Sequence, residues 1–578
     1  MDRTGSQGED VLAGEVAPVW PSRPLVFSVL ALLAGLLFAA SLTSDIIAAV
    51  LLRRQDLILI TLSAVLAGAA LLPILPARRP LIIGWRAIGL IMVATAALAY
   101  AGHYWLLLGY DFTRDEQMAS FDATIFSGGR LVWPLPPEWQ RHAAELNLRF
   151  MPSAGAQQLA WVSGYLPMNA AIRALFGLAG DAALAGAAYL AASVLLVWSC
   201  GRRLWPDKPE TATVCVLLLV SAGQFILAGM TAYAMPAHLC FNLLWLRLFL
   251  ANRRSADLGA VAVGFIATGL HQPLFHPMFV APFLLMLLAE RNWRRLLFFV
   301  PLYALIGAFW LSWPMYISGL VAGPGGVTEN ANGGYIVRAF QLIFQSRDNL
   351  PTMAANLLRF CGWQNVLLVP LVLASWPVVR KGGLAAALAL GFVLPILVIT
   401  ILLPSQGFGF GYRYLHGVLG NAVLLAGYGW SRFEGSAAIR SSLIRATAAS
   451  LLLLMPVQGW MSHGLYAANA RASARIDASK ADYALVPEAN LAIWHDLALN
   501  RPDLSNRPIR LIEPLVADPA DLARRICRPG ITVALFADSF FDPIADSLDI
   551  PRSETAGVGM MRDRPPLEAR GCRVKLLD

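Results

Sequence analysis

Four carboxylates lie close together in one polar segment, and they are the first residues of the chain that could do acid–base chemistry. They are Asp111, Asp115, Glu116 and Asp122. A helix over 115–126 would place Asp115 and Asp122 on one face, because residues three, four or seven positions apart share a face. Glu116 would point elsewhere. An ionised carboxylate within hydrogen-bond reach of a hydroxyl can take its proton. A solvated loop without chemistry fits the same composition.

An arginine in the segment PSQGFGFGYRYLHG is the second group of chemical interest. Arg413 is always charged, and its planar guanidinium can bind a phosphate through two hydrogen bonds. Glycines leave backbone N–H groups accessible to an anion, and the neighbouring side chains could contact the same anion. These side chains are Tyr412, Tyr414 and His416. An arginine that extends its charged head from the end of a span to the membrane surface fits the sequence equally well.

The elements that position these residues belong to a membrane protein. The chain has 578 residues, of which 57% are hydrophobic and 14% are charged, whereas soluble domains contain about a quarter charged residues. The apolar content excludes a disordered chain, 47 glycines are too few for collagen, and 6 cysteines are too few for a disulfide scaffold. The excess positive charge lies in short loops, where it sets orientation, so we expect no nucleic-acid partner.

Apolar stretches recur along most of the chain, and many approach the roughly 20 residues that a membrane span needs. About thirteen such stretches lie near 24–52, 57–77, 81–109, 182–200, 211–230, 236–251, 258–271, 277–290, 296–317, 353–378, 384–404, 414–431 and 444–463. The sequence therefore predicts an all-α polytopic membrane protein with about 11–13 transmembrane helices. The segment after the last stretch is near neutral and predicts a solvated domain.

Lysine and arginine cluster in alternate loops, which predicts the sidedness of the chain. The rule places the tail 1–23 in the cytoplasm, the transmembrane domain 24–463 in the bilayer and the domain 464–578 outside. The outer face then carries two long loops, 110–181 and 318–350. We therefore expect the carboxylates and Arg413 on the outer face of a bacterial inner membrane.

Several further features lie on this outer face. All eight histidines fall at outer span ends, in outer loops or in the C-terminal domain, although a single imidazole at an interface is common without function. The loop 318–350 has glycine-punctuated pieces and carries Arg338 and Arg347, which are second choices for binding phosphate. This loop is expected to act as a mobile lid. The outer pair Arg53–Arg54 is the exception to the charge rule.

The outer loop 110–181 contains three further elements. Gly128–Gly129 would end the helix 115–126, and the segment 133–139 is stiff, aromatic and rich in proline. Residues 164–180 predict a short amphipathic helix along the membrane surface. We expect these elements to lie in the membrane interface or to line a groove.

In this order, the residues resemble a known family. Asp115-Glu116 outside an early span, Gly128-Gly129, the aromatic and proline stretch 133–139 and an amphipathic helix ending in Phe-Gly resemble the first outer loop of the GT-C membrane glycosyltransferases. Protein O-mannosyltransferases and the lipid A aminoarabinose transferase are the members that it resembles most. Further matches are Met235-Pro236, Pro273 with Pro277 and Pro282, Trp293-Arg294-Arg295, Trp313-Pro314-Met315-Tyr316 and Gly411-Tyr412-Arg413-Tyr414. The resemblance covers about 85–465, and the order of the pieces carries it.

The resemblance implies a GT-C-like fold, a sugar donor linked to polyprenyl phosphate, and inverting transfer to an acceptor on the outer side. It implies Asp115 as the general base, with Glu116 and Asp122 as supporting acids. Arg413 would then bind the phosphate that leaves. The acceptor is left open as a lipid, a glycan or a protein.

The chain departs from the family pattern at its histidines. Members often have an acidic residue after the Met-Pro turn and a basic residue near the next turn, where this chain has His238, then His271 and His276. One explanation is a divalent metal bound by these histidines with Asp115 or Glu116. Hydrogen bonding of the histidines to the phosphate or the sugar is as consistent with the sequence. No other cofactor is implied.

The segment 464–578 predicts a small α/β domain. Residues 468–499 have a helical pattern broken at Pro487, and RPIRLIEPL and GITVALFAD alternate like strands. Cys527 and Cys572 are the two cysteines of this domain and could form a disulfide in an oxidising compartment. The other four, Cys200, Cys215, Cys240 and Cys361, fit apolar packing positions.

Two other functions compete with an enzyme. A transporter or flippase for a lipid-linked precursor would need ionisable side chains along a path through the spans, and Arg247 and Arg359 lie towards span ends. A GT-C-like scaffold without activity would explain the histidine departures. An outer cavity shared by Asp115 and Arg413 would favour an enzyme, because a flippase needs a route to both leaflets.

Overall fold

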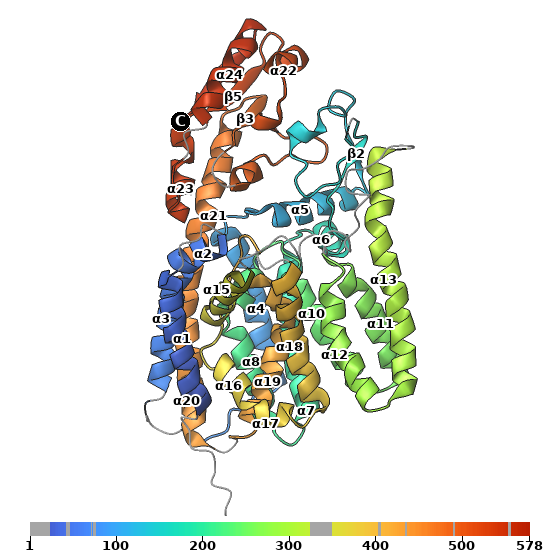
Figure 1. The fold of residues 1–578 in the computed structure, drawn as a ribbon, viewed down its shortest axis with the longest axis vertical. Coiled ribbons are helices and arrows are strands. Elements are labelled where there is room, and N and C mark those ends of the chain that lie inside the picture. The colour runs from blue at the N-terminus through green and yellow to red at the C-terminus, as the bar shows by residue number, and fades with distance from the viewer. Residues whose placement is uncertain are drawn as a thin grey trace, which may run out of the picture.

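Helices that run side by side along the long axis of the molecule make up most of the chain (Figure 1). The computed structural model describes residues 23–41, 47–70, 72, 77–155, 157–323, 349–402, 406–433, 436–488, 492–552 and 556–578. A second layer, built from the C-terminal residues, lies at one end of the helical bundle (Figure 1). The predicted fold class, a helical membrane protein with a small α/β domain, is confirmed.

Six of the described helices are long and apolar enough to cross a membrane. They are α1 (Arg23–Ser41), α4 (Trp85–Trp105), α7 (Leu184–Leu204), α13 (Trp293–Ala322), α18 (Gly383–Leu402) and the continuous segment Ala437–Ala478. That segment comprises α20 (Ala437–Ala449), a π-helical turn η4 (Ser450–Leu454) and α21 (Met455–Ala478). The outer surfaces of α1 and α4 expose large apolar side chains such as Leu37 and Leu90, which suit lipid rather than water. The chain is a multi-pass membrane protein.

The other described apolar stretches form shorter helices. These are α2 (Ile47–Leu51), α3 (Leu57–Ala70), α8 (Pro209–Val220), α9 (Gly223–Ala228), α10 (Met235–Phe249), α11 (Arg254–Thr268), α12 (Phe275–Ala289), α15 (Asn349–Gly362), α16 (Leu368–Ala374), α17 (Trp376–Val379) and α19 (Leu419–Trp430). The predicted spans 211–230 and 353–378 are divided, and so fewer continuous spans form. At the two breaks, the backbone N–H of Gln224 donates to Trp363 O at 3.2 Å. Backbone groups freed by the breaks are thus satisfied inside the protein.

A thin layer covers the end of the bundle that faces the C-terminal domain. It contains α5 (Arg114–Ser127), α6 (Met168–Leu178), the 3₁₀ turn η2 (Ala143–Leu146), and β1 (Trp133–Pro134) paired antiparallel with β2 (Ala160–Trp161). Helix α5 agrees with the predicted helix 115–126. Helix α6 is shorter than predicted, because Gly164 and Tyr165 form a bend and the helix begins only after Pro167. Figure 1 shows both helices between the bundle and the C-terminal domain.

The C-terminal domain contains a parallel sheet with strand order β4-β3-β5-β6. Its strands are β3 (Tyr483–Val486), β4 (Ile509–Ile512), β5 (Thr532–Phe536) and β6 (Arg573–Leu577). Its helices and 3₁₀ turns are η5 (Ala492–Leu497), η6 (Glu513–Leu515), α22 (Pro519–Ile526), η7 (Asp538–Phe541), α23 (Asp542–Leu548) and α24 (Ala556–Ala569). The predicted disulfide between Cys527 and Cys572 is present and joins the end of α22 to the start of β6.

One element of this domain differs from the prediction. The pattern predicts a helix over 468–499, but α21 ends at Ala478 and β3 follows at Tyr483. Lys480 adopts a left-handed conformation (φ 54°) that ends the helix. The short apolar run of β3 is then buried between β4 and β5, so tertiary packing decides its conformation.

Polar contacts join the C-terminal domain to the layer below it. The indole N–H of Trp161 donates to Pro502 O at 2.9 Å, and Arg525 Nη2 lies 2.7 Å from Glu145 Oε1. Arg54, in the π-helical turn η1 (Leu52–Asp56), pairs with Asp549 after α23. The arginine pair that breaks the charge rule therefore lies at the end of the bundle that carries the C-terminal domain.

Candidate active site

Helix α5 begins with a capping motif that uses Glu116. Thr113 donates its backbone N–H and its hydroxyl to Glu116 Oε2, each at 3.0 Å, and Tyr466 OH donates to Glu116 Oε1 at 2.9 Å. Burial and the nearby Asp111 raise the pKa of Glu116 to about 8. Glu116 is fully buried, and its contacts fasten the start of α5 to α21. Its role as a supporting acid stays a prediction.

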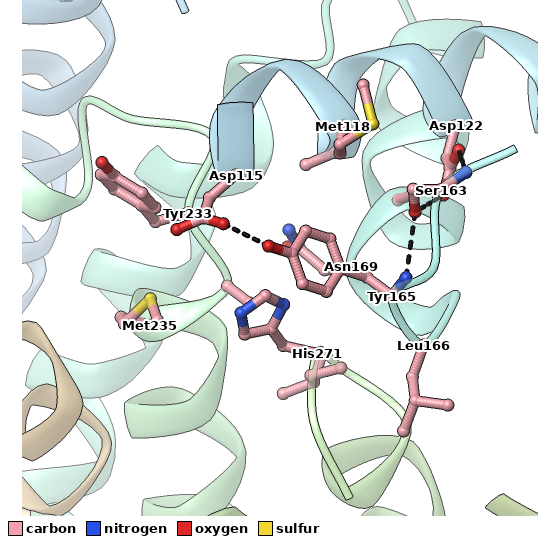
Figure 2. A pocket seen from close by; sticks show the side chains of 14 residues that line it. Asp115, Met118, Asp122, Ser163, Tyr165, Leu166, Asn169, Tyr233, Met235 and His271 are labelled. Atoms are coloured by element: carbon pink, nitrogen blue, oxygen red, sulfur yellow. Dashed lines mark hydrogen bonds between the residues drawn. The ribbon is translucent and has the colours of Figure 1, made fainter. Parts of the chain in front are cut away.

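Asp115 contacts Arg413 although the two residues lie far apart in the chain. Asp115 Oδ2 is 2.5 Å from Arg413 Nη1, and the two side chains are 12% and 10% exposed. Tyr165 donates its hydroxyl to the other carboxylate oxygen, Oδ1, as Figure 2 shows. Each oxygen of Asp115 thus has its own partner, one cationic and one phenolic.

The partners of Asp115 keep it ionised. Burial alone would raise the pKa of Asp115, but the positive charge of Arg413, together with His271 and the hydroxyl of Tyr165, outweighs burial and lowers it. Burial and the charge of Asp115 raise the pKa of the Tyr165 hydroxyl. Tyr165 therefore remains a donor, and Asp115 remains a proton acceptor at neutral pH.

The guanidinium of Arg413 is oriented by its own loop and by two aromatic rings. Gln406 Oε1 accepts from the backbone N–H of Arg413 at 2.7 Å, and Gln406 O accepts from Arg413 Nη2. Arg413 Cζ lies 4.8 Å from the ring centre of Tyr233 and 5.5 Å from that of Tyr414. These contacts leave Nη1 directed at Asp115.

A cavity beside Asp115, which we call the first hollow, faces one side of α5. Its lining includes Asp115, Met118, Asp122, Ser163, Tyr165, Asn169, Tyr233, Met235 and His271. These side chains come from α5, from α6 and the segment before it, from the start of α10 and the loop before it, and from the loop between α11 and α12 (Figure 2). The face of α5 that carries Asp115 and Asp122 is turned to this hollow, as their spacing predicts.

Asp122 lies in the same hollow with different partners. Ser163 donates its backbone N–H to Asp122 Oδ1 at 2.9 Å and its hydroxyl to Oδ2 at 2.5 Å. Burial raises the pKa of Asp122 to about 7, against these two hydrogen bonds. Asp122 therefore changes charge near neutral pH, whereas Asp115 stays ionised.

A second cavity, which we call the second hollow, lies on the other side of Arg413. Its lining is Met235, His238, Asn242, Phe275, Pro395, Arg413, Tyr414, Gly417 and Val418. His238 is 3% exposed, and both of its ring nitrogens lack a hydrogen-bond partner among the described residues. Apolar walls with a guanidinium and an unsatisfied imidazole suit a ligand that is apolar with an anionic or hydroxyl-bearing end.

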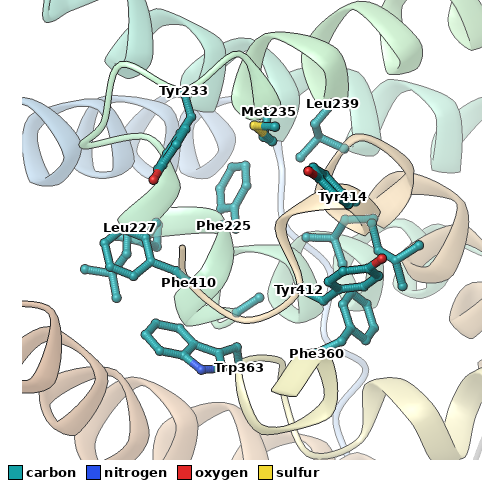
Figure 3. Packing of buried hydrophobic residues seen from close by; sticks show 14 of the residues in the cluster. Phe225, Leu227, Tyr233, Met235, Leu239, Phe360, Trp363, Phe410, Tyr412 and Tyr414 are labelled. Atoms are coloured by element: carbon teal, nitrogen blue, oxygen red, sulfur yellow. The ribbon is translucent and has the colours of Figure 1, made fainter. Parts of the chain in front are cut away.

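Three other predicted binding residues lie away from the two hollows. The ring of Tyr412 is fully buried in the aromatic core with Phe360 and Trp363, as Figure 3 shows. His416 is also fully buried and lines neither hollow. His276 bonds to Asn242 Oδ1 at 2.7 Å and Tyr303 OH at 2.9 Å. Arg413 begins the 3₁₀ turn η3 (Arg413–Val418). Tyr412 and His416 line neither hollow, and their contact with an anion bound at Arg413 stays a prediction.

The donor set proposed for a metal does not assemble. Within the described part of the chain, no three histidine, cysteine, aspartate or glutamate side chains are placed to hold a metal ion. Glu116 and His276, two of the predicted ligands, are instead bound to tyrosine and asparagine side chains. Arg338 and Arg347 lie outside the described residues.

Three residues of the site escaped the sequence analysis. Tyr165, Tyr233 and Gln406 each contact Asp115 or Arg413. Gln406 belongs to the same glycine-rich segment as Arg413. Tyr165 lies two positions before Pro167, the residue that precedes α6. No spacing pattern links these residues to Asp115, because their placement depends on how distant helices pack.

Comparison with known proteins gives matches at the level of structure. No family model matches the chain, and no curated protein matches it. The chain is similar to ArnT from Cupriavidus metallidurans bound to undecaprenyl phosphate, with 16% identity and a TM-score of 0.43 over 85% of this chain and 90% of that chain. It is also similar to the apo form, with 15% identity and a TM-score of 0.43 over 85% and 89%. ArnT is the aminoarabinose transferase that the sequence motifs resemble.

Proposed function

We propose that this protein is a membrane glycosyltransferase that moves a sugar from a polyprenyl-phosphate donor to an acceptor hydroxyl, with inversion at the sugar. The single observation that carries the proposal is the contact between Asp115 and Arg413 beside two hollows. A base and a phosphate-binding cation at this separation can act on the two ends of one transfer reaction.

In the proposed reaction Asp115 is the general base. It takes the proton of the acceptor hydroxyl while that oxygen attacks the anomeric carbon of the donor. The bond from this carbon to the phosphate oxygen breaks, and its electron pair leaves with the lipid phosphate. The lowered pKa of Asp115 keeps the carboxylate ionised before the reaction. Attack from the side opposite the leaving phosphate inverts the anomeric carbon.

Arg413 stabilises the phosphate that leaves. Its Nη1 pairs with Asp115, so a phosphate that binds this guanidinium would compete with the carboxylate and free an oxygen of Asp115. The second hollow would take the phosphate and the first lipid units, with His238 and Asn242 as hydrogen-bonding groups and Phe275 and Pro395 as apolar walls. His271 lies at the edge of the first hollow, beside Asp115.

The first hollow would receive the acceptor. Asp122, Ser163 and Asn169 are among the residues that line it, and they offer hydrogen bonds to hydroxyl or amine groups. Asp122 supports the reaction as a binding group rather than as the base, because it accepts two bonds from Ser163. Glu116 supports it indirectly, through the start of α5.

The same proposal places the site on the outer side of a bacterial inner membrane, with the C-terminal domain outside. Helices α5 and α6 contribute residues to the lining of the first hollow, and they lie at the end of the bundle that the C-terminal domain covers (Figure 1). This arrangement favours an enzyme over a flippase, which needs a path between the two leaflets. The lipid donor would enter from the bilayer, and the acceptor from the aqueous or lipid phase at that face.

Purified protein in nanodiscs tests the proposal. Decaprenyl phosphate serves as the binding probe, and decaprenyl-phosphate-linked mannose, arabinose and aminoarabinose serve as donors to membrane lipid extracts, with products identified by mass spectrometry. We expect Asp115→Asn to reduce transfer by about 100-fold or more. Decaprenyl phosphate binding should be as strong as in wild type or stronger, because the phosphate no longer competes with a carboxylate for Arg413. We expect Arg413→Gln to weaken this binding by about tenfold, the loss of one charge-assisted contact.

The control is Asp207→Asn, which changes an exposed carboxylate in the turn between α7 and α8. It should change neither binding nor transfer. Full transfer activity in Asp115→Asn would refute the base, and a wild-type protein that does not bind decaprenyl phosphate would refute the donor class.

A further inference from the structure

A buried ion pair lies behind the loop that carries Arg413. Arg359 Nε is 2.5 Å from Asp56 Oδ2, and both side chains are fully buried. The indole N–H of Trp363 donates to the second oxygen, Asp56 Oδ1, at 2.5 Å. Asp56 ends the π-helical turn η1, whereas Arg359 and Trp363 belong to and follow α15. The pair therefore connects the N-terminal helices to the centre of the bundle.

The stability of the fold does not by itself explain why this buried ion pair is present. Removing two charges from water costs several kcal/mol per ion, and replacing a buried pair by neutral side chains of similar size is often neutral or stabilising. Ionisable residues within membrane proteins are therefore uncommon without a function. The contacts of Arg359 beyond Asp56 indicate what that function is.

Arg359 also contacts the loop that carries Arg413. Its Nη2 donates to Gly409 O at 3.0 Å. A Cβ added to Gly409 would lie 3.0 Å from Arg413 Cδ, so this part of the backbone lies directly against the side chain of Arg413. Trp363, which binds Asp56, also stacks near Phe410 with ring centres 5.5 Å apart.

A second set of bonds fixes the next part of the same loop. Gln224 Nε2 donates to Tyr412 O at 2.9 Å, and Gln364 Nε2 donates to Gln224 Oε1 at 2.6 Å. The backbone that precedes Arg413 is thus held at two carbonyl groups, one on each side of residues 410–411. Both supports come from helices that do not line the first hollow.

We propose that Asp56 and Arg359 are positioning residues for Arg413. Asp56 orients the guanidinium of Arg359, Arg359 fixes the carbonyl of Gly409, and the loop then directs Arg413 Nη1 at Asp115. The inference rests on the proposed role of Arg413 in binding a lipid phosphate. It assigns a role in the site to the N-terminal helices, which lie at the edge of the bundle (Figure 1).

The test removes both charges together, so that no unpaired charge is left inside the protein. Asp56→Asn with Arg359→Met keeps the acceptor for Trp363 but removes the bond to Gly409. We expect the double variant to remain folded in nanodiscs and to weaken decaprenyl phosphate binding by about tenfold, as loss of a buried charge-assisted contact would. A purely structural role would lower the melting temperature and the active fraction but leave the dissociation constant unchanged.

A matched control exists elsewhere in the bundle. Glu210 and Arg440 form a buried ion pair with Nε and Oε1 2.6 Å apart and side chains 4–5% exposed. Glu210→Gln with Arg440→Met should leave decaprenyl phosphate binding within about twofold of wild type. In an Arg413→Gln background, the variant at 56 and 359 should cause no further loss of binding, since the residue being positioned is absent.

Arg359→Lys gives an independent measurement. Lysine keeps a cation beside Asp56, but one ammonium group cannot reproduce the fork of contacts to Asp56 and Gly409, so we expect binding between wild type and the double variant. Unchanged binding of decaprenyl phosphate, both in the folded double variant and in Arg359→Lys, would overturn the positioning role. A wild-type protein that does not bind decaprenyl phosphate would instead overturn the proposed function, so the two failures are distinguishable.

Discussion

Asp115 and Asp122 share a face of α5 and a hollow, and they differ in charge because their partners differ. Asp115 meets a guanidinium at 2.5 Å, whereas Asp122 meets the hydroxyl and the N–H of Ser163. A cation compensates for burial, and neutral donors compensate for it only in part. One helix thus presents an ionised carboxylate and a titrating carboxylate to the same hollow.

The pKa of Asp122 predicts a pH dependence of stability. Its folded-state pKa of about 7 lies above the ordinary aspartate value of 3.8, so the folded chain retains a proton that the unfolded chain has released. Stability from this group is therefore present at low pH and is lost as the pH rises towards 7. Asn mimics the protonated acid, and Asp122→Asn should unfold at a melting temperature that changes less between pH 5 and pH 8 than that of wild type.

Melting curves of detergent-solubilised protein at several pH values provide the measurement. Asp207→Asn, at an exposed position, should retain the wild-type pH profile. An Asp122→Asn profile parallel to that of wild type would show that Asp122 does not titrate in this window.

Sequence reasoning identifies the charged residues of the site better than their neutral partners. The spacing of Asp115 and Asp122 defines a helix face from local geometry, and the family order places Arg413 on the same side of the membrane. Tyr165 and Gln406 come from segments whose positions depend on long-range packing. Tyr412 and His416 lie close to Arg413 in the chain, but both are fully buried and line neither hollow.

At the scale of elements, the glycine-rich loop before Arg413 has a shape that other residues cannot adopt. Gly411 has φ 59°, and a Cβ there would lie 3.0 Å from Gln224 Oε1 and from Trp363. Left-handed backbone costs a side-chain-bearing residue about 1–2 kcal/mol, and the close neighbours add to this cost. The loop therefore packs tightly against the polar network that supports it.

This geometry predicts different effects for two alanine substitutions. Gly411→Ala should lower the melting temperature and weaken decaprenyl phosphate binding several-fold, because relief of the contact with Gln224 shifts the loop. Gly382→Ala has the same kind of left-handed backbone (φ 87°) but open space around its Cβ. It should lower the melting temperature through the left-handed backbone cost alone, and so by less than Gly411→Ala, and it should leave binding unchanged. If the two variants bind decaprenyl phosphate equally well, the position of this loop does not determine binding.

The elements that the sequence misplaced are those decided by burial. The helix pattern over 468–499 contains the run Tyr483–Val486, which forms the central strand β3 once β4 and β5 flank it. The apolar stretches 211–230 and 353–378 look continuous, but polar residues such as Gln224 bond across the bundle at their breaks. Hydropathy detects the length of an apolar stretch. It does not detect where the free backbone groups of two broken helices form hydrogen bonds with each other.

For the whole molecule, the C-terminal domain, the layer of α5 and the contact between Arg54 and Asp549 lie at one end of the bundle. The loops rich in lysine and arginine that contain Lys208 and Lys381 follow α7 and α17 at the other end (Figure 1). The positive-inside rule assigns the second end to the cytoplasm. The end of the bundle that carries the C-terminal domain and α5 is therefore predicted to face outward.

Labelling of single cysteines in spheroplasts tests this orientation. In a Cys361→Ser background, the described native cysteines are either buried or bridged. Glu138→Cys in the outer loop and Ser547→Cys in the C-terminal domain, both at exposed positions, should react with a membrane-impermeant maleimide added to spheroplasts. Lys381→Cys, equally exposed, should react only after the membrane is opened. If Lys381→Cys is labelled first, Asp115 and Arg413 face the cytoplasm, and the donor and acceptor must be sought on that side.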